Sequence, residues 1–258
     1  MTDDQLCEIL ASFVAADRGN ALSIDGTRIY AAPILGVATA GDPLFEQLRE
    51  PAVVGPRHLL PSDWLPGARS VLSYFLPFSP AIRESNRCPG LPSRAWAQAR
   101  IDGEAFNDAA RLRLTGLMRE LGEDALAPGL DPRLAVVDLR SNWSERHVAY
   151  VTGLGTFGLS RSLITRLGAA GRLGSVVTTL PLPPTRRQYS GPFAYCPSLS
   201  GGACEACVQR CPSGAVTPAG KDVPTCRRHL HDVVRPQFAP AYGCAKCQTG
   251  VPCEAGVP

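Results

Sequence analysis

Cysteine is the residue type that most constrains this chain. Eight of the ten cysteines fall in the last quarter of the 258-residue sequence, at positions Cys196, Cys204, Cys207, Cys211, Cys226, Cys244, Cys247 and Cys253. In the run 204–212, gaps of two and then three residues separate the thiols, and a proline follows the last one. This spacing is typical of a chain that wraps a [4Fe–4S] cluster. Since eight thiolates supply two such clusters, the series predicts two [4Fe–4S] clusters.

Two other uses of cysteine compete with this interpretation. Paired CxxC units also form four-cysteine zinc sites, and secreted chains use cysteine for disulfides. The N-terminus, MTDDQLCEIL, is acidic and lacks the apolar core of a signal peptide. No apolar run approaches the roughly 20 residues of a membrane span, so we expect a cytoplasmic protein with no membrane partner. The proline after Cys211 and the thiols outside CxxC pairs favour iron–sulfur clusters, with zinc as the alternative and disulfides last.

The first 190 residues show alternating helix and strand patterns. Thr2 and Gln5 have the spacing of a capping box before an apolar helical stripe, and we expect further helices over 93–122 and from 142 to 153. Strands are predicted over 70–78, 134–138 and 173–180, with a loop over 79–93. This alternation indicates α/β layers around one sheet. A proline-rich stretch over 181–192 predicts a domain junction, and the net charge of +3 argues against a dedicated nucleic-acid surface.

A glycine motif precedes the predicted junction. Gly153, Gly155 and Gly158 match the dinucleotide-binding pattern GxGxxG, which needs a strand before it and an acidic residue about 20 positions later. Here a predicted helix precedes the motif, and no Asp or Glu occurs between positions 159 and 203. We therefore expect no dinucleotide site. The glycines allow a sharp turn and a close approach to a flat ligand, or they serve a structural turn alone.

The order of these features resembles one family. Asp138, then Glu145 and Arg146, then the glycine motif and the cysteine series resemble the epoxyqueuosine reductases, which are cobalamin-dependent iron–sulfur enzymes related to the reductive dehalogenases. The resemblance covers about residues 55–255. It implies an α+β fold, with an α/β-layered, nitroreductase-like domain over 1–190 that binds cobalamin or a flavin. A small ferredoxin-like domain with two [4Fe–4S] clusters would follow over 191–258.

The resemblance also implies roles for single residues. Asp138 would be the catalytic acid, with a plain loop aspartate as the alternative. The corrin would contact Gly153, Gly155, Gly158 and Ser160. One cluster would be held by Cys196, Cys204, Cys207 and Cys253, and the other by Cys211, Cys226, Cys244 and Cys247. Cys196 lies further upstream and Cys253 further downstream than the family pattern places them, and Asp138 lies about one residue further from the glycines.

The expected function is a cobalamin-dependent reductase of a small molecule, supplied with electrons by a ferredoxin or flavodoxin. One alternative is an electron-transfer protein that activates a corrinoid or a partner enzyme. Another is reduction of epoxyqueuosine in tRNA. Family members continue into a helical-repeat region that helps to grip tRNA, whereas this sequence stops at Pro258, which makes tRNA the less favoured substrate. A flavin in place of cobalamin is also less favoured.

Overall fold

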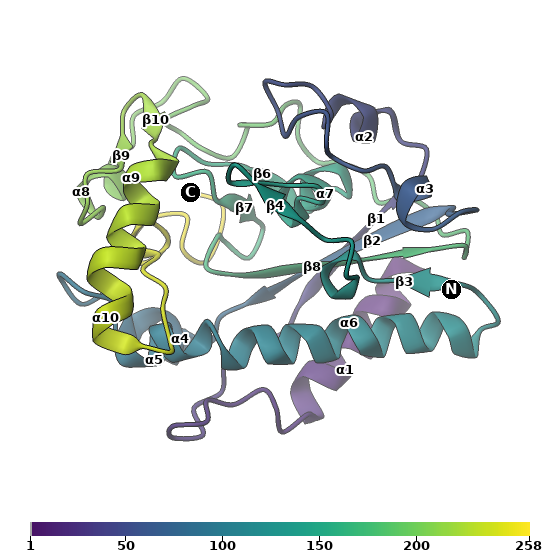
Figure 1. Ribbon diagram of the computed structural model, residues 1–258, viewed down its shortest axis with the longest axis horizontal. Helices are drawn as coiled ribbons and strands as arrows, with labels where there is room; N and C mark the ends of the chain where they lie inside the picture. The colour runs from purple at the N-terminus through teal and green to yellow at the C-terminus, as the bar shows by residue number, and fades with distance from the viewer. Residues whose placement is uncertain (1) are drawn as a thin grey trace.

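A four-stranded antiparallel sheet forms the centre of the protein. The computed structural model describes residues 2–258, and the strand order is β1-β2-β8-β3 (Figure 1). The strands are β1 (Ile34–Thr39), β2 (Ser70–Pro77), β8 (Gly171–Thr178) and β3 (Ala125–Leu126). Every residue of β2 is buried, because other elements cover both faces of the sheet. The strands predicted over 70–78 and 173–180 are therefore the two central strands.

Two long helices cover one face of this sheet. They are α1 (Asp3–Ala16) and α6 (Asp102–Glu120). Leu10 and Leu114 of these helices share a core with Leu72 of the sheet. The capping box of Thr2 and Gln5 is confirmed, since each side chain bonds the backbone N–H of the other. The leucines of the helical stretch predicted over 93–122 are not all buried, since Leu112 and Leu121 are exposed.

Shorter elements cover the other face. They are α2 (Pro43–Gln47), α3 (Pro61–Trp64) and α7 (Glu145–Val151). Phe45, Trp64 and Trp143 form a second apolar core with Val71 and Val177 of the sheet. The helix predicted from position 142 begins at Glu145 instead, because Asn142 ties the preceding hairpin together through Ala135. The sheet thus carries a separate core on each face.

Two segments differ from the sequence expectation. The predicted loop over 79–93 contains α4 (Pro80–Ser85), which starts with Ser79 as N-cap and Pro80 in its first turn, and α5 (Arg94–Ala99) follows. The strand predicted over 134–138 is not buried. It forms an exposed hairpin of β4 (Val136–Val137) and β5 (Arg140–Ser141). Its short valine run looks like a core strand, but it pairs with only one other strand.

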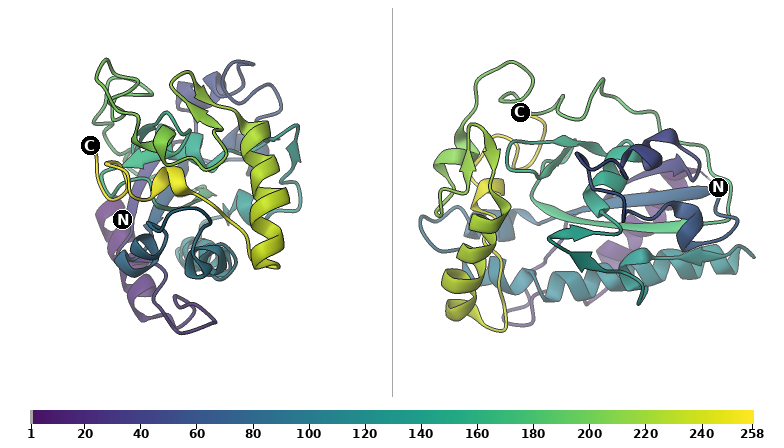
Figure 2. Two further views of the ribbon diagram at one scale, coloured as in Figure 1. Left: turned by 90° about the vertical axis from the view of Figure 1, so that its left-hand side faces the viewer. Right: turned by 45° about the horizontal axis from the view of Figure 1, so that its top comes forward.

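The remaining elements are short, and those after residue 200 lie at the end of the molecule away from β3 (Figures 1 and 2). They are α8 (Ala206–Gln209), β9 (Val216–Thr217), β10 (Gly220–Lys221), α9 (Val223–Arg228), the π-helix η2 (His229–Val234), α10 (Arg235–Phe238) and η3 (Lys246–Gln248). Earlier in the chain, η1 (Pro128–Leu130) precedes β4, and β6 (Gly155–Phe157) pairs with β7 (Leu163–Thr165). Within residues 2–258, no helix is long and apolar enough to cross a membrane.

Candidate metal centre and adjoining hollow

The first group of cysteines predicted to share a cluster is brought together by the fold. This group consists of Cys196, Cys204, Cys207 and Cys253. Burial, and then the neighbouring Cys207, Cys196 and Cys204, raise the pKa of the Cys253 thiol to about 12. Ile164 and Ala169, at the β6–β7 hairpin, pack against several of these cysteines. The four thiols therefore face one another although nearly 60 residues of chain separate the first from the last.

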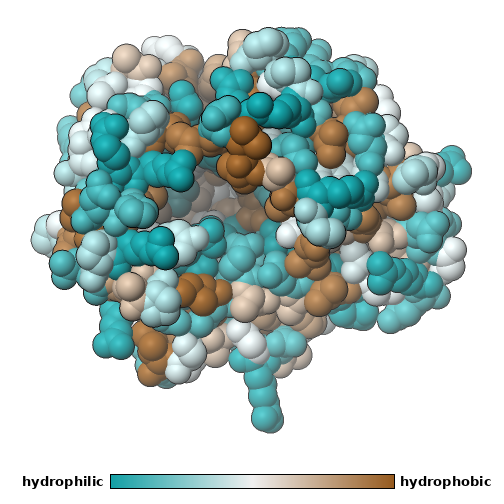
Figure 3. All heavy atoms as spheres, in the orientation of Figure 1, coloured by the Kyte–Doolittle hydropathy of each residue, from teal (hydrophilic) through white to brown (hydrophobic). Residues whose placement is uncertain are grey.

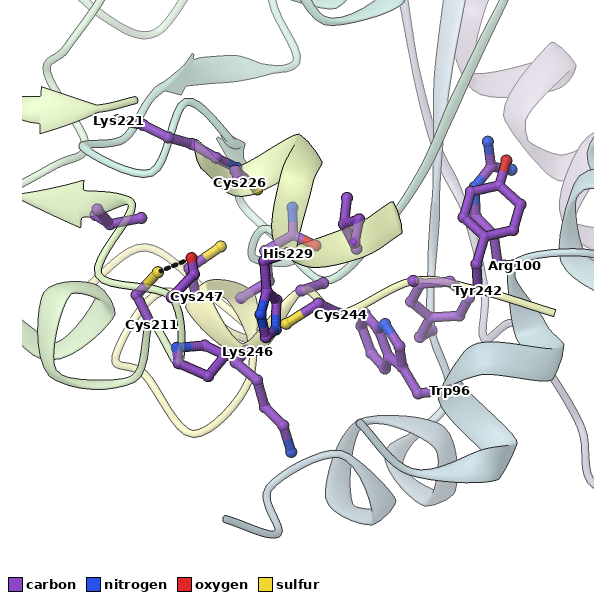
Figure 4. Close-up of a pocket in the computed structure, with 18 of the residues that line it drawn as sticks. Trp96, Arg100, Cys211, Lys221, Cys226, His229, Tyr242, Cys244, Lys246 and Cys247 are labelled. Atoms are coloured by element: carbon purple, nitrogen blue, oxygen red, sulfur yellow. Dashed lines mark hydrogen bonds between the residues drawn. The ribbon is translucent and has the colours of Figure 1, made fainter. Parts of the chain in front are cut away.

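The second group is also brought together. It consists of Cys211, Cys226, Cys244 and Cys247, and all four line one cavity of about 230 Å³ (Figure 4). Burial raises the pKa of the Cys247 thiol, Lys221 lowers it, and Cys226 and Cys211 raise it. Burial is also the main cause that raises the pKa of Cys244 to about 11. The partition into two groups of four is the one that the family resemblance implied; which atoms they ligate stays a prediction.

The spacing of these thiols bears on the kind of metal they fit. Among residues 2–258, no three or more His, Cys, Asp or Glu side chains lie close enough to hold a single metal ion. The case for metal therefore rests on the grouping of the thiols. Four thiols around a cavity supply the ligand set of a [4Fe–4S] cluster, whose sulfur ligands bind four different irons. After burial, the neighbouring Cys247 of the second group raises the pKa of the Cys207 thiol, as do Cys196 and Cys204 of its own group. The two sites therefore adjoin.

A clamp of hydrogen bonds fixes the second group to the first half of the chain. The ammonium of Lys246, which is 2% exposed, donates to the backbone oxygens of Asn86 (3.0 Å) and Cys88 (2.6 Å). The Asn86 amide donates to the backbone oxygen of Cys244 (3.0 Å), and Arg210 donates to that of Asn86 (3.1 Å). Cys88 is itself exposed, with its sulfur 3.2 Å from the Lys246 nitrogen. We call this set the Asn86 clamp.

The glycine motif forms the turn after α7 and the start of β6. Gly153 has a φ of +88°, which favours glycine. A Cβ on Gly155 would lie 2.0 Å from the backbone oxygen of Ile164, because β6 and β7 pack closely there. Ser160 is buried and donates to Ser162, whose hydroxyl accepts from Gln248 (2.7 Å). These residues therefore support the cysteine-bearing segment, and their contact with a cofactor stays a prediction.

A hollow opens in the middle of one face, above α6 in the view of Figure 3. Charged side chains of α6, α7 and β8 approach one another between these elements. Arg111 of α6 lies 2.9 Å from Glu104 and 3.5 Å from Glu145 of α7. Arg172 of β8 lies 3.7 Å from Glu104, and both Arg172 and Arg100 also line the cavity of the second cysteine group. This charged row thus leads from the cysteines toward α7.

Glu145 has an unusual environment within that row. Its side chain is 21% exposed, yet both carboxyl oxygens are buried and form no hydrogen bond to any residue of 2–258. Burial raises its pKa, and Arg111 only partly offsets this effect. Buried carboxyl oxygens that form no hydrogen bond are rare in native proteins. Glu145 does not cap α7 through its side chain, so its position is available for a ligand.

Asp138, the predicted catalytic acid, lies elsewhere. It occupies the turn between β4 and β5 with a φ of +51°, and its side chain is 85% exposed. Its carboxylate lies 3.4 Å from Arg57, which is also exposed. An exposed pair of this kind contributes little to stability. The hairpin position is therefore free to serve function, and the catalytic role of Asp138 stays a prediction.

Sequence reasoning missed Arg111, His229 and Lys246. Arg111 has a signal in the sequence, because it falls on the buried face of α6 between Asn107 and Leu114. His229 has a weaker one, since it lies one helical turn after Cys226. Lys246 lies between two predicted ligands, but nothing in the sequence places its partner Asn86 nearby. The long-range contact that buries this lysine therefore appears only in the fold.

The chain resembles known epoxyqueuosine reductases in sequence and fold. It is 27% identical to the epoxyqueuosine reductase of Bacillus cereus over 207 residues, which cover 76% of this chain and 51% of that protein. The Bacillus subtilis epoxyqueuosine reductase, solved with an aspartate-bearing catalytic loop swung out of the active site, aligns at a TM-score of 0.56 and 20% identity over 99% of this chain and 67% of its own. An epoxyqueuosine reductase bound to an epoxyqueuosine-modified tRNA stem loop aligns at a TM-score of 0.52 and 20% identity, over 98% and 66%.

These similarities confirm the family resemblance predicted from the motifs. They also show the mixed α and β fold over nearly the whole chain. The chain spans about half the length of the curated relative from Bacillus cereus. No family model matches the sequence.

Proposed function

We propose that this chain is an iron–sulfur reductase that reduces a small molecule, with two [4Fe–4S] clusters relaying electrons to an organic cofactor in the hollow. The observation that carries this proposal is the grouping of the eight cysteines into two adjoining sets of four, one of them around a cavity of about 230 Å³. A residue set of this kind fits two cubes with no thiol left over. The curated relative is named as a reductase, which supports the same activity.

The organic cofactor proposed is cobalamin, with flavin as the less favoured choice. When bound, cobalamin would supply a cobalt centre that accepts electrons from the clusters and passes them to the substrate. The proposal follows from the resemblance to the epoxyqueuosine reductases, and the cavity of the second cysteine group, which Arg100 and Arg172 also line, supports it. Both of these arginines also pair with Glu104 of the charged row. They would bind polar groups of the cofactor or substrate near the clusters. The nitroreductase-like domain would cover 1–190 and the ferredoxin-like domain 191–258.

Reductive removal of an oxygen or a halide from carbon also requires a proton. Two carboxyl groups of this chain are candidates to hold it. Asp138 lies at an exposed hairpin turn. In the Bacillus subtilis enzyme, an aspartate-bearing catalytic loop is likewise swung out of the active site. We therefore propose that the β4–β5 hairpin moves inward when substrate binds. Glu145 already faces the charged row, and burial raises its pKa, which favours the protonated form that a proton donor requires. Asp138→Asn and Glu145→Gln separate the two roles. Substitution of the proton donor should abolish turnover while cluster content is unchanged, and substitution of the other carboxyl group should not.

A small-molecule substrate is proposed, because a net charge of only +3 argues against a dedicated nucleic-acid surface. Reduction of epoxyqueuosine in tRNA is the alternative, supported by the relative solved with a modified tRNA stem loop. A ferredoxin or flavodoxin is the proposed electron donor.

Anaerobic reconstitution tests the proposal directly. The full chain, treated with iron and sulfide, should bind about eight irons and eight labile sulfides. Cys226→Ser and Cys253→Ser should each lose about half, whereas Cys7→Ser should lose none, because Cys7 contacts Pro33 far from both groups. Added cobalamin should then change its absorption bands when a low-potential reductant is supplied.

Two results would overturn parts of this proposal. One zinc per four cysteines without labile sulfide would remove the redox function altogether. Clusters without any change in the corrin bands would leave the alternative of an electron-transfer protein that activates a partner.

A further inference from the structure

His229 lies in the cavity of the second cysteine group. It follows the last residue of α9 and comes three residues after Cys226, so both side chains project from nearly the same side of the helix. Both line the cavity, and Figure 4 shows the His229 ring pointing into it. His229 Nε2 is buried and forms no hydrogen bond to any residue in the described range 2–258. Because nearly all buried polar atoms in native proteins are hydrogen-bonded, the lack of a partner for this nitrogen indicates that a ligand binds in the cavity.

The local backbone supports this interpretation. His229 begins the π-helix η2, which runs to Val234 between α9 and α10. Single π-turns inside helices are rare and occur frequently at functional sites. His231, two residues later, points away and pairs with Asp232 in solvent at 3.0 Å, with 69% of its side chain exposed. The chain therefore offers one histidine turned inward and a matched one turned outward.

The two cysteine groups differ in the polar groups around them. The cavity of the second group is also lined by Lys221, whose charge lowers the pKa of the Cys247 thiol. The apolar cluster that contains Leu159 and Ile164 packs against cysteines of both groups, so the difference between the two sites lies in the polar Lys221 and His229 beside the second. Hydrogen bonds to the sulfurs and positive charge nearby raise the reduction potential of an iron–sulfur cluster. The second site is therefore built for the higher potential.

We propose that His229 donates a hydrogen bond to the second [4Fe–4S] cluster and thereby sets its reduction potential above that of the first. The inference rests on the proposed function, because it requires that both clusters form. His229 acts here as a positioning residue with a tuning role and is not a cluster ligand. A cluster of higher potential is reduced first, so the site on α9 would hold the electron before the first cluster does.

A redox titration of the reconstituted full chain, followed by electron paramagnetic resonance, tests this inference. His229→Phe keeps a ring but removes the N–H. We expect it to lower one of the two midpoint potentials by about 59 mV or more, which is a tenfold change for a one-electron couple. His229→Gln retains an N–H donor and should restore most of the potential. His231→Gln is the control and should leave both potentials unchanged.

The outcomes distinguish this inference from the proposed function. Failure of the unmodified chain to bind labile sulfide would refute the proposed function. Two assembled clusters with identical potentials in the wild type and in His229→Phe would refute the role of His229, as would equal shifts of both clusters. Loss of four irons from His229→Phe but not from His229→Gln would support the hydrogen bond. The same loss from both variants would refute it in favour of a packing role.

Discussion

Acidification should destabilise the region around α7 through two histidines. His58 is 1% exposed and stacks on Trp143, and its Nε2 accepts the backbone N–H of Ser144 at 3.3 Å. His147 contacts the Ser144 hydroxyl at 2.7 Å and packs on Phe157. Burial lowers the pKa of His58 from 6.5 to about 4. Burial, followed by the charge of Arg146, lowers that of His147 from 6.5 to about 3.

The size of the effect follows from these values. Because both folded-state pKa values lie below 6.5, the unfolded chain takes up protons first as the pH falls. The stabilisation from the neutral imidazoles is therefore complete above pH 6.5 and is lost as the pH falls toward the folded values. Between pH 7 and pH 5 each histidine lowers the free energy of unfolding by about 2 kcal/mol, so the pair together lowers it by about 4 kcal/mol. This is a large fraction of the 5–15 kcal/mol typical of a folded domain.

Urea unfolding at pH 7 and pH 5, followed by circular dichroism under anaerobic conditions, measures this difference. The control is the double variant His58→Gln/His147→Asn, whose amides keep the bonds to Ser144 but do not titrate. The wild type should lose about 4 kcal/mol more than the variant between the two pH values. Equal losses in the two proteins, in the same cluster-loading state, would refute the reasoning.

Three further predictions follow from other residues. Cys196→Ser should remove about four irons from the reconstituted protein and Cys88→Ser none; equal iron content in the two variants would contradict the ligand assignment. Gly155→Ala should cost at least about 1–3 kcal/mol in chemical denaturation, because its Cβ would meet a backbone oxygen at 2.0 Å, whereas Gly116→Ala, in open space, should not destabilise the protein. Glu145 has a raised pKa, so its stabilisation exists below pH 4.5 and is lost as the pH rises. Unfolding midpoints of Glu145→Gln should therefore fall less between pH 4 and 8, and parallel pH curves would disprove this.

Local sequence patterns predicted the elements that depend on local physics. The Thr2 capping box, the strand over 70–78 and the helical stretch over 93–122, which the structure divides into α5 and α6, each carry their own signal of caps or periodicity. The strand expected over 134–138 failed for a physical reason. Burial depends on what covers a strand, and the run of valines does not reveal that β4 pairs only with β5 at the surface.

The sequence predicted which thiols lie together, but not the residues that surround them; metal ligation by these thiols stays a prediction. Spacing and family resemblance pointed to the eight thiols. The buried His229 nitrogen and Glu145 carboxyl, which form no hydrogen bond within residues 2–258, instead depend on packing between distant segments. Glu145 lies three residues after Asn142, which is the spacing of a capping box. Its oxygens nevertheless accept no backbone N–H of residues 2–258. Only the fold places it next to Arg111.

The Asn86 clamp has a consequence for how the protein matures. The oxygens that hold Lys246 belong to a loop made more than 150 residues earlier in the chain, and the same loop fixes the backbone at Cys244. We therefore expect the thiols of the second cysteine group to reach their places only after the first half of the chain has folded. Iron delivered during synthesis would meet unorganised thiols, whereas iron delivered after release would meet a prepared cavity. We therefore expect iron and sulfide to bind more readily to the folded chain, because the contacts of Asn86 and Lys246 position Cys244 only after folding.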